Sequence, residues 1–172
     1  KLTNPAGSVF VLKNGSILNI CDHGTRGALV GKGYGGDAGG VLRLSNSNTT
    51  VNLYNIDVYT TGGVMDNGAV ISNSGYLSLY NVNVTGGEAA KKGGAICVMP
   101  SGSLRMFGGS VQGGTAAVDG DNLFIAGNAY LEDVTVEGGI AANAEGKTFV
   151  IRGGSISGGK YGLILRSGTL AL

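Results

Sequence analysis

The stretch Leu77-Ser78-Leu79-Tyr80-Asn81-Val82-Asn83-Val84 contains the pattern that decides the fold of this chain. If its first residue is position 0, apolar side chains occupy positions 0, 2, 5 and 7, and a glycine pair, Gly86-Gly87, follows. Residues two apart share one face of a β-strand, so positions 0 and 2 point the same way, as do positions 5 and 7. The alternation slips by one residue between these two pairs. The chain must therefore bend at position 4, which is Asn81.

The same pattern, with apolar or small residues at these positions, recurs along the chain. Weaker copies begin at Leu18 and Leu170, and the other full copies are Val51–Val58, Leu104–Val111, Ala129–Val136 and Phe149–Ile156. Position 4 always holds asparagine, aspartate or glycine, the residue types that best tolerate a left-handed backbone. Its occupants are Asp22, Asn55, Asn81, Gly108, Asp133 and Gly153. The sequence therefore predicts a structural corner at these six positions, stacked along one edge.

The spacing of the copies limits what one repeat can contain. The starts at 18, 51, 77, 104, 129, 149 and 170 are separated by 33, 26, 27, 25, 20 and 21 residues. A period of 20–27 residues accommodates about three short strands with turns, but no strand followed by a long helix. Apolar stretches upstream of the corners supply the third strand, at residues 41–44, 69–71, 95–98, 123–125 and 163–165. We predict one all-β domain over residues 1–172, a right-handed parallel β-helix of about seven coils, roughly 30–35 Å long.

The composition agrees with a packed solenoid. The chain has 172 residues, of which 34 are glycine, 42% are hydrophobic and only 13% are charged, with a net charge of +1. A chain this apolar can bury a core, so the glycines indicate turns rather than a flexible linker. The absence of a basic surplus argues against nucleic acid as a partner. No apolar run approaches the roughly 18 residues needed to span a bilayer.

A short motif links the chain to a known group of proteins. Gly93-Gly94-Ala95-Ile96 matches the GGAI motif of the polymorphic outer-membrane protein family, and residues 39–42 and 68–71 are similar to it. The companion FxxN motif is missing, because no phenylalanine has an asparagine three residues later. As an architecture, the chain resembles the right-handed β-helix repeats of large bacterial surface proteins and autotransporter-like adhesins. This resemblance implies an extracellular, cell-surface location in a bacterium and a structural or adhesive role.

No catalytic, metal or cofactor site is predicted. Glycoside hydrolysis needs two carboxyl groups about 5–10 Å apart, and neither outward column at positions 6 and 8 carries two acids. The nearest cluster is Asp119 and Asp121, followed in the next strand by Glu132, Asp133 and Glu137; we interpret these as solvated surface acids. Residues 31–36 fit the spacing of a dinucleotide-binding loop, but a strand pattern follows them instead of a helix. A carbohydrate-active β-helix, either a polysaccharide lyase or a glycosidase, is the enzyme alternative.

The outward column at position 3 is the candidate binding surface. Its occupants are Cys21, Tyr54, Tyr80, Phe107, Glu132 and Arg152. The three aromatic residues on consecutive coils predict a ladder along one corner. Such a ladder either fixes the register of the coils or offers a platform for sugar rings or another protein. The absence of tryptophan weighs against the carbohydrate interpretation.

The cysteines and the chain ends complete the expectations. Cys21 and Cys97 lie about three strand spacings apart, roughly 14 Å, which exceeds the approximately 7 Å limit for a disulfide. We expect two free thiols, with Cys97 inside the coil as a small hydrophobic residue. The sequence stops at Leu172, position 2 of a new coil, without a polar cap. Either the chain is part of a longer β-helix, or its ends are covered by other copies stacked end to end.

Overall fold

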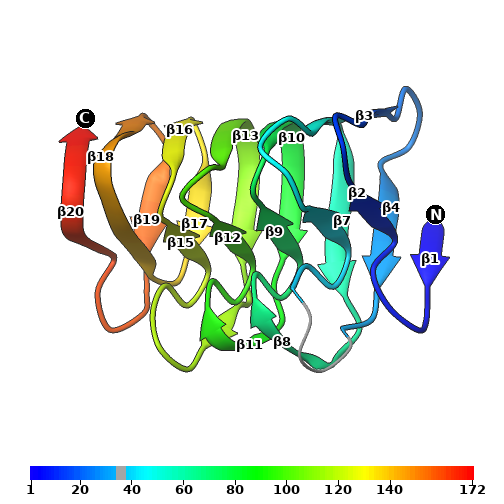
Figure 1. The fold of residues 1–172 in the computed structure, drawn as a ribbon, viewed down its shortest axis with the longest axis horizontal. Coiled ribbons are helices and arrows are strands. Elements are labelled where there is room, and N and C mark those ends of the chain that lie inside the picture. The colour runs from blue at the N-terminus through cyan, green and yellow to red at the C-terminus, as the bar shows by residue number, and fades with distance from the viewer. Residues whose placement is uncertain (34–37) are drawn as a thin grey trace.

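The computed structural model describes residues 1–33 and 38–172, and these residues form an all-β parallel β-helix. The coils stack along the longest axis of the molecule, with β1 (Leu2–Asn4) at one end and β20 (Leu163–Ala171) at the other (Figure 1). Neighbouring coils are joined by parallel strand pairs. The predicted fold class is therefore confirmed.

Each coil contributes strands to three sides, and some long strands turn a corner to serve two of them. On the first side lie β2 (Phe10–Leu12), β5 (Leu42–Leu44), β9 (Ile71–Asn73), β12 (Ile96–Val98), β15 (Leu123–Ile125) and the first parts of β18 (Ile140–Arg152) and β20. On the second lie β3 (Ile17–Cys21), β6 (Thr50–Tyr54), β16 (Asn128–Glu132), the starts of β10 (Tyr76–Thr85) and β13 (Ser103–Gln112), and the ends of β18 and β20. On the third lie β1, β4 (Gly27–Gly31), β7 (Ile56–Thr60), the ends of β10 and β13, β17 (Thr135–Glu137) and β19 (Ser155–Ser157).

A small additional sheet lies where the glycine pairs leave the third side. It consists of β8 (Val64–Asn67), β11 (Glu88–Lys92) and β14 (Thr115–Ala116), and β11 is its central strand. This sheet was not predicted, because its strands are short and lack a regular apolar alternation.

On the second side, the register agrees with the predicted repeats in every coil. The seven starts are paired with one another in order along the second side: Leu18, Val51, Leu77, Leu104, Ala129, Phe149 and Leu170. The predicted number of coils was slightly too high. The structure has about six turns, because the copy that begins at Leu170 completes no further turn.

The corner is confirmed at five of its six predicted positions, where the backbone φ angle is positive. The angles are 54° at Asn55, 53° at Asn81, 63° at Gly108, 54° at Asp133 and 62° at Gly153. Asp22 is the exception and has no positive φ. Its coil carries four extra residues, 23–26, before Gly27 pairs with Ile56, so a loop replaces the sharp corner. The carboxylate of Asp22 accepts a hydrogen bond from the Gly24 amide at 2.9 Å in this loop.

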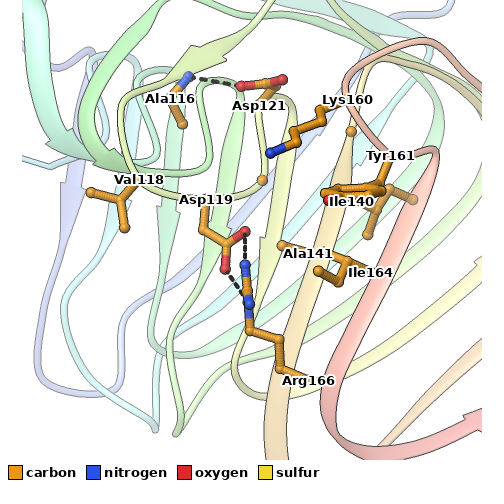
Figure 2. Close-up of a pocket in the computed structure, with 12 residues that line it drawn as sticks. Ala116, Val118, Asp119, Asp121, Ile140, Ala141, Lys160, Tyr161, Ile164 and Arg166 are labelled. Carbon is orange, nitrogen blue, oxygen red and sulfur yellow. Dashed lines mark hydrogen bonds and ion pairs between the residues drawn. The ribbon is translucent and has the colours of Figure 1, made fainter.

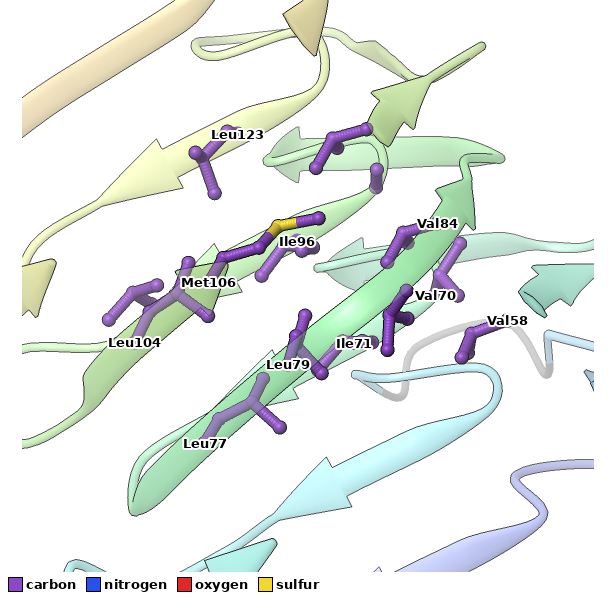
Figure 3. Close-up of a cluster of buried hydrophobic side chains, with 14 of the residues drawn as sticks. Val58, Val70, Ile71, Leu77, Leu79, Val84, Ile96, Leu104, Met106 and Leu123 are labelled. Atoms are coloured by element: carbon purple, nitrogen blue, oxygen red, sulfur yellow. The ribbon is translucent and has the colours of Figure 1, made fainter. Parts of the chain in front are cut away.

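The side chains at positions 0, 2, 5 and 7 fill one continuous core inside the coils (Figure 3). Leu53, Leu79 and Met106 occupy the same column in three consecutive coils, and each has 0% of its surface exposed. Complete burial of such side chains contributes about 1.5–3 kcal/mol each. The glycine-rich segment is followed by strand β5 and not by a helix, although Tyr34–Gly36 lie outside the described residues.

Candidate functional site

The aromatic column forms a ladder, as the sequence predicts. The rings of Tyr54 and Tyr80 lie 4.6 Å apart between centroids and are nearly parallel, with an angle of 3° between their planes. Tyr80 and Phe107 are 5.1 Å apart at 7°. Parallel pairing in register places these side chains directly above one another on successive coils.

This stacking determines which part of each ring is accessible. Both faces of Tyr80 are covered by its neighbours, so its ring presents an edge to solvent. A sugar that stacks on an aromatic residue needs a free ring face. The geometry thus supports the interpretation that Tyr54, Tyr80 and Phe107 fix the register of the coils more than the interpretation as a sugar platform.

Tyr130 extends the aromatic ladder and was not predicted. Its ring lies 5.5 Å from that of Phe107 at an angle of 43°, and the guanidinium of Arg152 lies 5.8 Å from its ring centroid. Its hydroxyl donates a hydrogen bond to Glu132, which raises the pKa of Tyr130. Tyr130 belongs to the position 1 column, not position 3, so a search within one column misses it.

A polar ladder runs beside the aromatic one. Asn81 donates to the side-chain oxygen of Asn55 at 3.0 Å, and Asn83 donates to Asp57 at 3.1 Å. Arg26, from the loop that follows Asp22, pairs with Asp57 and also donates to the carbonyl of Asn81 at 2.7 Å. One arginine thus links three successive coils and makes the corner a hydrogen-bonded unit.

The prediction that the acids of the cluster are solvated holds for only some of them. The side chain of Asp119 has only 13% of its surface exposed. Its carboxylate accepts two hydrogen bonds, of 2.8 and 3.2 Å, from Arg166. Asp119 is therefore not a solvated turn acid, because the turn folds back against β20. The same hydrogen bonds raise the pKa of Arg166.

Asp119 and Asp121 line one pocket, together with Lys160, Tyr161 and Arg166 (Figure 2). Glu132, Asp133 and Glu137 do not line it. Glu132 accepts from Tyr130, while Asp133 and Glu137 are exposed. Within residues 1–33 and 38–172, no group of three or more His, Cys, Asp or Glu residues is placed to hold a metal ion.

Both cysteines are free thiols, as predicted, but Cys97 does not lie inside the coil. Ile96 and Val98 belong to the main core, whereas Cys97 packs with Phe124 and Ala141 in a separate cluster. Alternation along β12 therefore directs Cys97 to the outer face, where neighbouring side chains leave it 1% exposed. This burial raises the pKa of its thiol to about 12.

Comparison of the chain with protein-family models, with curated proteins and with solved structures finds no match. In the part of the chain that the structure describes, no helix has the length and apolar character required to cross a membrane.

Proposed function

We propose that this chain is a non-catalytic structural and adhesive rod module of an extracellular bacterial cell-surface protein. The observation that carries the proposal is the pair of side-chain ladders along the stack. The aromatic ladder joins the coils of Tyr54, Tyr80 and Phe107, and the polar ladder links adjacent coils at the corner. Both kinds of ladder lie outside the core and hold successive coils in one register.

Rigidity is the property that these contacts supply. Stacked aromatic pairs contribute about 0.5–1.5 kcal/mol each beyond the area that they bury. In a solenoid each coil contacts only its neighbours, so the interfaces between coils determine its resistance to bending and unwinding. A rod with reinforced interfaces suits a segment that projects binding surfaces from a cell, as in the bacterial surface proteins that this sequence resembles.

The end coils supply a route to longer rods. Strand β20 pairs on one side with β18, and its apolar Leu163 and Leu170 are only partly buried against the core. Further coils of a longer chain, or the end of another copy, would bury these side chains. Light scattering across a range of concentrations separates the two cases, because only association between copies increases the mass at high concentration.

Surface labelling tests the proposed location and role. Antibodies against the folded module are applied to intact cells that express the natural protein, with a cytosolic protein as the permeability control. We expect labelling of unpermeabilised cells, and weaker cell adhesion after in-frame deletion of the module. Labelling that requires permeabilisation would contradict the proposal.

A carbohydrate-active β-helix is the second candidate, favoured by the mixed pocket around Asp119 and Asp121. Acidic polysaccharides such as polygalacturonate and alginate, incubated with the protein and calcium, give unsaturated or reducing products if it is a lyase or a hydrolase. Sustained turnover that is lost in Asp119→Asn and Asp121→Asn would replace the non-catalytic proposal with this one.

A further inference from the structure

The pocket near the C-terminal end of the stack combines apolar and polar surfaces. It has a volume of about 220 Å³ and lies between the turn that carries Asp119 and Asp121, strand β18, and the start of β20 (Figure 2). This volume is below the roughly 300–1,000 Å³ of pockets that bury drug-sized ligands. The pocket therefore suits one small ring more than an extended chain.

The polar groups of the pocket include both hydrogen-bond donors and acceptors. Asp121 uses Oδ1 to accept from the Ala116 amide at 3.4 Å, and no described residue donates to its Oδ2. Lys160 extends its amine into the pocket toward the acidic side (Figure 2), and this amine forms no ion pair with any described residue. Arg166 binds Asp119 through Nε and Nη2, which leaves its Nη1 for another acceptor.

The charges of the pocket balance. Asp119 and Asp121 supply two negative charges, while Lys160 and Arg166 supply two positive charges. An ionised ligand gains little from such a site, since attraction to one pair is offset by repulsion from the other. A hydroxyl group both donates and accepts hydrogen bonds, so a ligand rich in hydroxyls can use the carboxylates and the cations together.

The remaining surface is apolar and partly aromatic. Ile140, Ala141 and Ile164 line the pocket, and Tyr161 lies beside them with 53% of its surface exposed. Tyrosine offers an apolar ring face together with a polar hydroxyl. No other aromatic ring in the described part of the chain stacks on Tyr161, unlike the rings of the ladder. The amine of Lys160 lies over one face of this ring, 5.4 Å from the centroid, so a ligand that shares this face also meets a donor.

We propose that this pocket binds one neutral pyranose residue of a glycan. The C–H face of the sugar lies against Tyr161 and the apolar residues, and its hydroxyls bond to Asp121, Lys160 and Nη1 of Arg166. This inference goes beyond the rod function, because the rod can form and project from a cell without any ligand here. It also places glycan recognition away from the aromatic ladder, whose inner ring faces are covered.

Saturation-transfer NMR on the whole chain tests the site. The neutral probes are the methyl glycosides of glucose, galactose, mannose and N-acetylglucosamine, and methyl glucuronide is the charged probe. For ligands of about a dozen heavy atoms we expect at least one neutral glycoside to bind with a dissociation constant on the order of 1 mM. We expect Tyr161→Ala to weaken this binding about three- to tenfold.

Matched variants establish the location. Lys160→Met retains the aliphatic stem but removes the donor, and Asp121→Asn retains an acceptor for Ala116; each is expected to weaken binding at least about threefold. Tyr76→Ala is the control, because Tyr76, at the start of β10, is 59% exposed and does not line the pocket. It should leave binding unchanged.

Two results would overturn the inference. They are no binding of any neutral glycoside, whether or not the glucuronide binds, and binding that Tyr76→Ala weakens as much as Tyr161→Ala does. Neither of them bears on the surface labelling that tests the rod function, so the two proposals fail separately.

Discussion

Asn81 offers the sharpest test of the corner, because substitutions there separate backbone strain from side-chain hydrogen bonding. Its φ angle is 53°, in the left-handed region, and its side chain donates to Asn55 at 3.0 Å. Alanine and glycine both remove the hydrogen bond. Of the two variants, only alanine keeps a Cβ atom in this left-handed conformation, and it lacks the polar side chain with which asparagine tolerates it.

The expected energies follow from these two contributions. Loss of the hydrogen bond, which is exposed, costs about 0.5–1 kcal/mol in either variant. The left-handed backbone costs a residue with a Cβ roughly 1–2 kcal/mol. At the next position in this column, Gly108, a Cβ atom would have no neighbouring atom within 4 Å, so an added methyl group meets no steric obstacle at the corner. We therefore expect Asn81→Ala to be less stable than Asn81→Gly by about 1 kcal/mol.

Ser78 provides the internal control, because it lies in the same strand, β10, and has an ordinary strand backbone. At this position glycine should be less stable than alanine by about 0.5–1 kcal/mol. Urea unfolding followed by circular dichroism at pH 7 measures all four variants. The order of the alanine and glycine variants should invert between the two sites. If glycine is the less stable variant at both sites, the left-handed corner is not what selects the residue at position 81.

Three further predictions concern the ladders and the buried thiol. Gly108→Asn should be more stable than Gly108→Ala by about 0.5–1 kcal/mol in urea unfolding, because both variants place a Cβ atom in the left-handed backbone but only asparagine supplies an amide that donates to Asn81, as Asn81 does to Asn55; equal midpoints for the two variants would argue against this geometry. Tyr80→Ala removes two stacked contacts and should cost about 1–3 kcal/mol beyond the lost burial. Tyr80→Phe keeps the ring contacts with Tyr54 and Phe107 and should be nearly neutral. Equal urea midpoints for the two variants would refute the role of stacking. The thiol of Cys97 should resist iodoacetamide in the folded protein at pH 8.5, because burial raises its pKa to about 12 and the thiolate is the nucleophile, whereas the exposed Cys21 should react. Mass mapping that finds Cys97 modified in native protein would contradict the burial. Because the pKa of Cys97 is higher in the folded state than its ordinary value of 9.0, the part of the unfolding free energy that depends on the protonated thiol should be intact below pH 9 and should decline as the pH rises toward 12.

The repeat is the part of the fold that sequence reasoning predicts best. Position 4 requires a special backbone, and Asn55, Asn81 and Asp133 do adopt it. The column of Tyr54, Tyr80 and Phe107 then follows from the register alone, because parallel strands align equivalent positions on adjacent coils.

The outer surface is harder to predict, for identifiable reasons. Ile96, Cys97 and Val98 are all apolar, so their periodicity does not reveal which one faces outward. The ion pair of Asp119 and Arg166 joins residues 47 positions apart. It depends on a turn outside the repeat and on a strand, β20, whose register with β18 shifts twice. Neither feature leaves a local pattern in the sequence, and the pocket depends on both.

The unequal lengths of the coils have a consequence for engineering. The repeat from Leu18 to Val51 spans 33 residues and that from Ala129 to Phe149 only 20, yet both pairs of strands are aligned. Length is thus free to vary at the turns, while one residue deleted inside a strand would exchange its buried and exposed side chains. Foreign peptides could therefore be grafted into the turns of successive coils and displayed as a row with spacing set by the strands, about 4.8 Å per coil.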